Sequence, residues 1–175
     1  MIPKRLARKV IYQSPWVNLY LDRVEFPNGQ VIEEHHLLDF DRQAVAAVLE
    51  DEAGRILLVQ VCRYTTVSTE WETPAGCVEQ GESLLEAVSR EVLEETGYVA
   101  KDYRQIYTYH PMNGIANQTF HIFHCSAVER KQKFDPNEIS AIRWFTQGEI
   151  REMIREQVVQ DGYTLTALLL WLHGV

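Results

Sequence analysis

The stretch GCVEQGESLLEAVSREVLEETGY, residues 76–98, constrains this chain most strongly, because it predicts a tight glycine loop that leads into one short helix. Ser83 is suited to cap the start of that helix, and Glu86 three residues later completes a capping box. Gly97 stands where helices commonly end in a left-handed residue. These three residues therefore predict where the helix begins and ends.

The polarity of this helix is wrong for an ordinary amphipathic element. With Leu84 placed at zero and about 100° advanced per residue, Ala87 and Val88 form an apolar stripe with it. Glu91 and Glu95 then fall within about 20° of Leu84, in the sector that faces the core. Buried carboxylates need a cation, and oxygen ligands suit a hard divalent ion. The helix therefore predicts a site for Mg²⁺ or Mn²⁺.

An acidic, solvated helix end in which Arg90 pairs with Glu94 is the alternative interpretation of these residues. The wider pattern favours the metal site, because the stretch resembles the signature of the Nudix hydrolases at every fixed position. Only the final aliphatic position differs, where Tyr98 stands. The matching residues are Gly76, Glu82, Arg90, Glu91, Glu94, Glu95, Thr96 and Gly97.

Composition narrows the classes of function. A chain of 175 residues with 46% hydrophobic and 24% charged residues suits one globular domain with a sizeable core. Its net charge of -8 argues against sequence-independent binding to nucleic acid. Three scattered cysteines favour a reducing compartment, and no apolar run is long enough for a signal peptide or a membrane span. We expect a cytoplasmic protein with neither nucleic-acid nor membrane partners.

The pattern along the chain predicts an α+β fold with a mixed sheet and helices packed on it. Residues 9–38 predict short strands, including a hairpin about the turn at 27–30. We expect a small N-terminal antiparallel β subdomain over residues 1–40, too small for its own core, and a main domain over 41–175. In that domain the pattern predicts strands at 44–50, 56–64, 104–109, 119–125 and 139–145, an extended piece at 71–76, and helices at 148–157 and 164–173.

Several segments outside the signature resemble the branch of the Nudix family that hydrolyses ADP-ribose and nucleoside diphosphate sugars. These segments are VNLYLDRVEFPNGQ, QVCRY, WETPAG, HPMNGIANQ and QDGYTLTALLL. The resemblance implies a Nudix α/β/α sandwich whose N-terminal subdomain is exchanged between the subunits of a homodimer. It also implies metal-dependent hydrolysis of a nucleoside diphosphate sugar to a nucleoside monophosphate and a sugar phosphate. Two alternatives remain: hydrolysis of another nucleotide, such as a triphosphate or dinucleotide, and a sensor module that binds nucleotide sugars without cleaving them.

The resemblance also implies roles for single residues. The expected metal ligands are Glu91 and Glu95 with Glu94 assisting, the carbonyl of Ala75, and Glu82 in support of the metal or the loop. Arg90 is expected to orient the helix glutamates, and Arg63, Trp16, Glu72 and Gly76 to bind substrate. Arg63 would contact phosphates or ribose, with a strand-end ion pair as its alternative. Trp16 would stack on the nucleobase from the partner subunit, with an ordinary hydrophobic anchor as its alternative.

The catalytic base is where this sequence departs from that branch. Many members carry a glutamate in the loop after the signature, whereas residues 114–118 here are GIANQ, and an amide cannot act as a base near neutral pH. Glu138, just before the last predicted strand, is the next candidate, with a turn-exposed glutamate as the alternative. Glu94 or Glu95 could instead activate a water, so the sequence leaves the base open.

Overall fold

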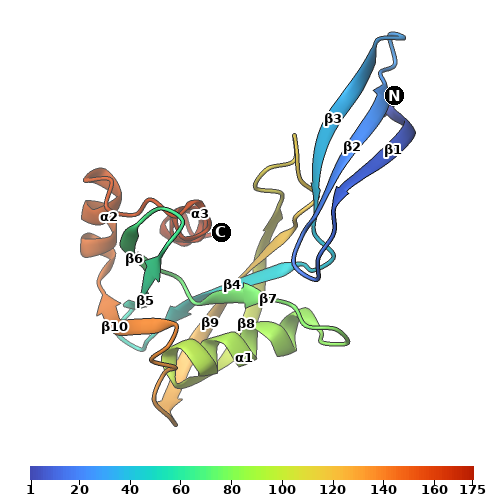
Figure 1. The fold of residues 1–175 in the computed structure, drawn as a ribbon. Coiled ribbons are helices and arrows are strands. Elements are labelled where there is room, and N and C mark those ends of the chain that lie inside the picture. Colours follow the sequence, from blue (N-terminus) through green and yellow to red (C-terminus); the bar gives the residue numbers. More distant parts are fainter. The chain divides into compact units, whose positions relative to one another are not determined.

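The computed structural model describes all 175 residues, which divide into two compact units (Figure 1). One unit comprises Met1–Gln43 together with His110–Thr119, and the other comprises Ala44–Tyr109 together with Phe120–Val175. The loop His110–Thr119 lies far from the N-terminal strands in the sequence but belongs to the same unit. No helix is long and apolar enough to cross a membrane.

The larger unit is built on a seven-stranded mixed sheet. Its strands are β4 (Ala44–Glu50), β5 (Ile56–Arg63), β6 (Ser68–Glu72), β7 (Ala75–Cys77), β8 (Tyr98–Tyr109), β9 (Phe120–Arg130) and β10 (Ile139–Phe145). The order is β10-β5-β4-β9-β8, with β6 paired to β5 and β7 paired to β4. β4 and β9 run parallel, and the other pairs are antiparallel.

Helices cover both faces of this sheet (Figure 1). α1 (Leu84–Thr96) packs on one face, and α2 (Gln147–Arg155) and α3 (Gly162–Leu172) pack on the other. Successive residues of a strand point to opposite faces, so Leu57 joins the core under α1 while Leu58 joins the core under α2 and α3. Burial on both faces explains the nearly continuous apolar run of β5. The predicted α/β/α sandwich with a mixed sheet is confirmed.

The caps of α1 are those that the sequence predicts. Ser83 Oγ accepts a hydrogen bond from the backbone N–H of Glu86 at 3.3 Å, and the Glu86 carboxylate accepts one from the Ser83 N–H at 2.8 Å. Gly97 has φ 76°, and a Cβ built on it would lie 2.0 Å from the carbonyl oxygen of Gln132. Glycine is required there both by the left-handed backbone and by the close approach of a neighbouring chain segment.

The smaller unit is a three-stranded antiparallel sheet of β1 (Lys4–Tyr12), β2 (Asn18–Glu25) and β3 (Val31–Asp39). The predicted hairpin is present, with Gly29 at φ 84° in its turn. Every residue of β1 is exposed. Arg8 reaches across to Asp22 with two hydrogen bonds of 2.7 Å, and its guanidinium lies 4.2 Å from the centroid of the Tyr20 ring. An ion pair and a cation–π contact thus help hold a sheet that buries little apolar surface.

Three strands are clearly longer than the sequence pattern predicts, and one of them, β9, continues to Arg130 rather than ending at residue 125. β1 begins at Lys4 rather than near residue 9, because an exposed strand has no apolar alternation to mark it. β8 begins at Tyr98, directly after the glycine cap, rather than at residue 104. Its pairing with β9 is interrupted between Lys101 and Arg104, where Asp102 has φ 55°, and this irregularity hides the alternation.

Candidate active site

The centre of the site is the contact between α1 and the loop that carries Gly76. Glu95 points inward from α1 with only 9% of its surface exposed, and its Oε2 accepts a hydrogen bond of 3.0 Å from the Ala75 N–H. The carboxylate of Glu91 lies against Gly76, so that a Cβ there would be 1.9 Å from Glu91 Oε1. Glu94 is the outer member, with its side chain 54% exposed. The structure thus brings two of the predicted carboxylates to the loop that carries Gly76 and leaves the third at its rim.

Arg90 ties this helix to the loop. Its Nε and Nη2 donate to the two carboxylate oxygens of Glu82 at 2.9 and 3.0 Å, and Nη2 also donates to the Cys77 carbonyl at 3.0 Å. Its Nη1 donates to Glu91 at 2.8 Å and to Glu94 at 3.2 Å. The predicted pair with Glu94 is therefore one of several, and Arg90 holds Glu91 in place as well. Glu82 serves the loop, because it also accepts from the Glu79 N–H at 2.9 Å.

The pKa values of the two inner glutamates are raised mainly by burial and further by neighbouring negative charge. Burial raises the pKa of Glu95 to about 8, against the opposing effect of the Ala75 hydrogen bond, and Glu91, Glu138 and Glu72 raise it further. Burial also raises the pKa of Glu91, although Arg90 opposes the shift. Glu138 raises the pKa of both residues, so its carboxylate lies close enough to affect the same centre.

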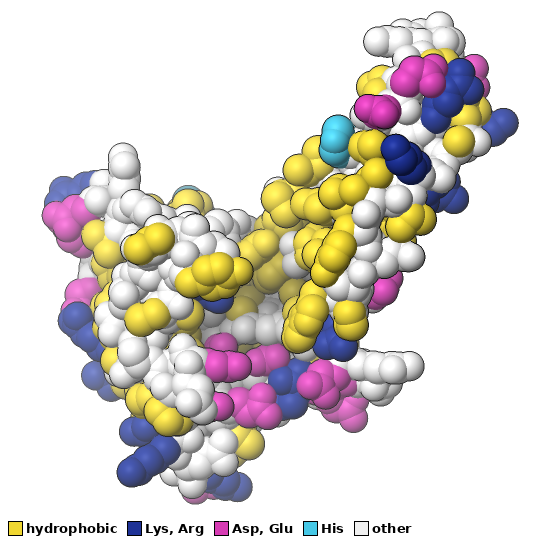
Figure 2. All heavy atoms as spheres, in the orientation of Figure 1, with side chains coloured by type: hydrophobic (Ala, Val, Ile, Leu, Met, Phe, Trp, Pro, Cys, Tyr) yellow, Lys and Arg dark blue, Asp and Glu magenta, His cyan; other side chains and the backbone are white.

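The donor set fits a divalent ion. No three acidic, histidine or cysteine side chains are already gathered into a metal-binding group. Glu91 and Glu94 are paired with Arg90, and Glu95 accepts from the Ala75 N–H. The available groups are nevertheless all oxygen donors, which Mg²⁺ and Mn²⁺ prefer. Gly76 leaves room for a carboxylate that any side chain would displace. Figure 2 shows acidic side chains gathered over this region of α1 and β7.

Arg63 and Glu72 form a second part of the site. Arg63 donates from Nε to Glu72 Oε1 at 2.8 Å and from Nη2 to Glu72 Oε2, while its side chain stays half exposed. Glu72 is only 4% exposed, so the structure makes it the partner of Arg63 rather than a side chain open to solvent. The strand-end ion pair considered for Arg63 is present, and it leaves Nη1 of the same guanidinium for a ligand.

The loop before Gly76 is fixed by contacts that the sequence did not reveal. The Thr73 N–H donates to Thr164 Oγ1 of α3 at 3.0 Å, and Pro74 O accepts from the Ala47 N–H of β4 at 2.8 Å. Both threonines are buried, and their hydroxyls lie 3.4 Å apart. Thr164 was not predicted as a site residue, because only its packing in three dimensions links it to the loop.

The residues considered for the base and for the nucleobase lie in different surroundings. Asn117, at the position where the branch often has a glutamate, accepts from the Phe40 N–H and donates to Asp39, both at 2.7 Å. It is thereby engaged within the N-terminal unit. Glu138 is exposed in the turn before β10. Trp16 is 75% exposed and has the Arg42 guanidinium 5.7 Å from its ring centroid, so it is not buried as an anchor in this chain.

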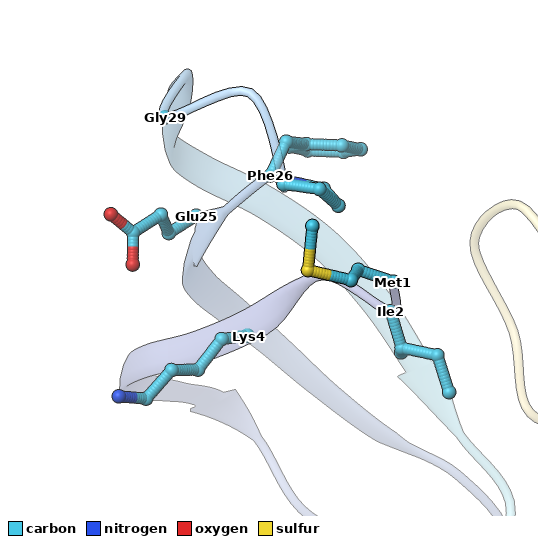
Figure 3. Close-up of a pocket in the computed structure, with 7 residues that line it drawn as sticks. Met1, Ile2, Lys4, Glu25, Phe26 and Gly29 are labelled. Carbon is cyan, nitrogen blue, oxygen red and sulfur yellow. The ribbon is translucent and has the colours of Figure 1, made fainter.

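A hollow at the tip of the N-terminal sheet is a poorer candidate (Figure 3). It has a volume of about 300 Å³ and offers Lys4 and Glu25 as its only charged side chains. Its lining has only one carboxylate and therefore no cluster that could hold a divalent ion. Catalytic chemistry is therefore better supported at the α1 site.

Comparison with known proteins agrees with this geometry. Residues 41–168 match the family model of the NUDIX domain, and residues 3–38 match that of the nucleoside diphosphate sugar hydrolase N-terminal domain. The chain is 30% identical over 168 residues to an ADP-ribose pyrophosphatase of Bacillus subtilis (strain 168), covering 94% of this chain and 90% of that protein.

Two further matches extend the comparison. The chain is 30% identical over 162 residues to the CMP-5'-(N-acetyl-N-hydroxy-3-aminopropyl)phosphonate hydrolase of Streptomyces rubellomurinus, covering 92% of this chain and 75% of that protein. The fold resembles a crystal structure of an ADP compounds hydrolase with a TM-score of 0.86 at 20% identity, covering 99% of this chain and 96% of that one.

Proposed function

The chain belongs to the Nudix family of pyrophosphohydrolases, and we propose that it hydrolyses the diphosphate bond of ADP-ribose or a related nucleoside diphosphate sugar. The products would be a nucleoside monophosphate and a sugar phosphate. The observation that carries the proposal is that α1 places the buried Glu95 carboxylate and the neighbouring Glu91 carboxylate against the loop that contains Gly76. The match of residues 3–38 to the N-terminal domain of nucleoside diphosphate sugar hydrolases supports the substrate class.

In this proposal Glu91, Glu95 and the Ala75 carbonyl would hold Mg²⁺ or Mn²⁺, with Glu94 at the rim and Glu82 positioning the loop through Arg90. A bound divalent ion supplies charge neutralisation for the diphosphate and lowers the pKa of a water molecule. Arg63 binds a phosphate oxygen through Nη1 while Glu72 fixes its guanidinium. Arg63 would thereby hold the substrate's diphosphate beside the carboxylates of α1.

The chemical step needs a proton acceptor. A water oxygen forms a bond to one phosphorus as the bridging oxygen leaves with the other phosphate, and a carboxylate takes the proton of the water. We assign this role to Glu138, because its charge reaches both Glu91 and Glu95 and it is exposed and thus open to water. Glu94 and Glu95 are the alternatives.

The proposal extends to assembly and location. By its resemblance to the ADP-ribose pyrophosphatase branch, we propose a homodimer in which the N-terminal sheet is exchanged and Trp16 stacks on the nucleobase. The exposure of Trp16 and of every residue in β1 is compatible with covering by a partner. Three free cysteines suit a reducing compartment, so we place the protein in the cytoplasm.

A substrate panel tests the proposed function. ADP-ribose, GDP-mannose, UDP-glucose, NADH and deoxynucleoside triphosphates are incubated with Mg²⁺ or Mn²⁺; phosphate is measured after phosphatase treatment for the first four, and released phosphate or diphosphate is measured directly for the triphosphates. We expect turnover of at least one nucleoside diphosphate sugar, and none after chelation of the metal. Glu95→Gln, which keeps the shape of the side chain, should abolish turnover with little change in melting temperature. If the wild type turned over no nucleoside diphosphate sugar, the proposal would be refuted. Turnover of triphosphates alone would favour the alternative of a Nudix hydrolase that acts on nucleoside triphosphates.

A further inference from the structure

A cleft of about 490 Å³ opens beside the Arg63–Glu72 pair, in the larger unit. It lies between the β5–β6 hairpin and the start of α3. The cleft lies close enough to the carboxylate site for charges to interact between them: the charge of Glu95 raises the pKa of Arg63, and the charge of Glu72 raises the pKa of Glu95. Its lining residues are Arg63, Thr65, Thr66, Glu70, Glu72, Gln160, Asp161, Gly162 and Tyr163.

The charge of this cleft is unusual for a site that handles a diphosphate. Its lining has three carboxylates, on Glu70, Glu72 and Asp161, and one cation, Arg63. Arg63 is already committed to Glu72 through a bidentate pair. The cleft therefore carries two negative charges in excess, and a second anionic group placed there would be repelled.

Asp161 lines the cleft and is held in a fixed position. It caps α3, with Oδ2 accepting a hydrogen bond of 2.8 Å from the Thr164 N–H. The cap orients the carboxylate while its other oxygen can still accept a hydrogen bond. Thr164 in turn holds the loop before Gly76 by accepting a hydrogen bond from the Thr73 N–H, so Thr164 anchors both Asp161 and this loop.

The remaining walls suit a ring with hydroxyl groups. Tyr163 stacks on Phe120 with ring centroids 3.9 Å apart and an interplanar angle of 6°, which fixes an aromatic wall. Gln160, Thr65 and Thr66 add an amide and two hydroxyls. Carboxylate acceptors, an aromatic face and neutral polar groups together bind sugar hydroxyls well, and once Arg63 holds a phosphate of the diphosphate no other cation in the lining is left for a further anionic group.

We propose that this cleft receives the group that the diphosphate links to the nucleoside, which is the sugar in a nucleoside diphosphate sugar. The cleft selects an uncharged, hydroxyl-rich group over an anionic one, with Asp161 as the specificity-determining residue. This inference rests on the proposed function, since it concerns the leaving part of a nucleoside diphosphate sugar. A carboxylate or phosphate on that part would meet the excess negative charge of the cleft. Removing one of these charges should change the discrimination by about tenfold.

The test compares a nucleoside diphosphate glucose with the matching glucuronate, on the nucleotide that the substrate panel selects. We expect the wild type to favour the glucose compound by at least tenfold in kcat/KM. Asp161→Asn keeps the cap, because an asparagine oxygen also accepts from the helix, but removes the charge. This variant should reduce the preference about tenfold, and Glu70→Gln should act in the same direction.

Two controls make the result decisive. Glu129→Gln removes one negative charge outside the cleft and should leave the preference unchanged. Dissociation constants of both compounds, measured by calorimetry on the full chain, should show the same ratios without any turnover. Equal wild-type kcat/KM or affinity for the two compounds, or an Asp161→Asn ratio within twofold of the wild type, would overturn the inference. Absence of turnover with the expected binding ratios would instead refute the proposed function and leave the inference standing.

Discussion

Replacing Gly76 with alanine is the most direct perturbation of the site. A Cβ on residue 76 would lie 1.9 Å from Oε1, 2.2 Å from Cδ and 2.6 Å from Oε2 of Glu91. Side-chain carbons essentially never approach other heavy atoms within 3.0 Å, so the Glu91 carboxylate must retreat by more than 1 Å. The backbone at Gly76 is not left-handed, and the obstructing atoms are the end of a flexible side chain. The variant should therefore fold.

The size of the functional loss follows from that displacement. Ligand distances to Mg²⁺ are about 2.0–2.1 Å and tolerate shifts of about 0.2 Å, so a carboxylate displaced by about 1 Å no longer binds the ion. Misplacement of a catalytic group by about 1 Å costs about 10²-fold in rate. We expect Gly76→Ala to lose about 10²-fold or more in kcat/KM and to need a higher concentration of Mg²⁺ or Mn²⁺. Its melting temperature should change by less than about 4 °C.

The assay is a metal titration of kcat/KM on the best substrate of the panel, accompanied by thermal melts followed by circular dichroism. Gly148→Ala is the matched control, because a Cβ there meets nothing closer than Thr146 Oγ1 at 3.9 Å. It should retain full activity. If Gly76→Ala kept activity within about threefold of the wild type, with the same metal dependence, the Glu91 carboxylate would not be a metal ligand in the position described.

The remaining predictions concern the base, the nucleobase, the helix cap and the N-terminal ion pair. Glu138→Gln should lower kcat by about 10²-fold if this residue accepts the proton; a loss under about threefold would return the role to the helix glutamates. Trp16→Ala should raise KM with little effect on kcat, and an unchanged KM would remove this residue from the nucleobase site. Gly97→Ala should lower the free energy of unfolding by more than about 2 kcal/mol in denaturant titrations, because it adds left-handed strain to a backbone clash; a smaller loss would show that the loop after β9 yields easily. The hydrogen bonds from Arg8 hold the pKa of Asp22 below its usual range, so their stabilisation is present above about pH 4 and is lost as the pH falls; Asp22→Asn should therefore flatten the acid side of the stability profile, and an unaltered profile would contradict this.

Features encoded by a local period were predictable from the sequence. The 3.6-residue repeat placed Glu95 in the core sector, and the structure buries it. Continuous or alternating apolar residues likewise predicted β4 and β10 with the bounds that they have. The capping residues predicted the ends of α1, because their hydrogen bonds lie within a few residues of one another.

Features that depend on distant partners were not predictable. The pairing of Arg63 with Glu72 is set by the register of β5 and β6, which periodicity does not give. The engagement of Asn117 with Phe40 and Asp39 joins segments more than seventy residues apart in the chain. Thr164 reaches Thr73 only because α3 packs on the sheet beside the loop. In each case the residue types were visible, but the contact that gives them a role was not.

The arrangement of hydrogen bonds explains why we propose Glu95 in particular as a metal ligand. Arg90 has already committed its Nε, Nη1 and Nη2 to Glu82, Glu91, Glu94 and the Cys77 carbonyl, so it makes no hydrogen bond to Glu95. One backbone N–H, that of Ala75, is the hydrogen-bond donor to this buried carboxylate. A carboxylate in such surroundings is costly to ionise unless a cation joins it. Because the loop is anchored at Thr73 and Pro74, it cannot relax away from the carboxylate, so its charge is relieved either by protonation, as the pKa of about 8 indicates, or by the divalent ion that we propose binds there.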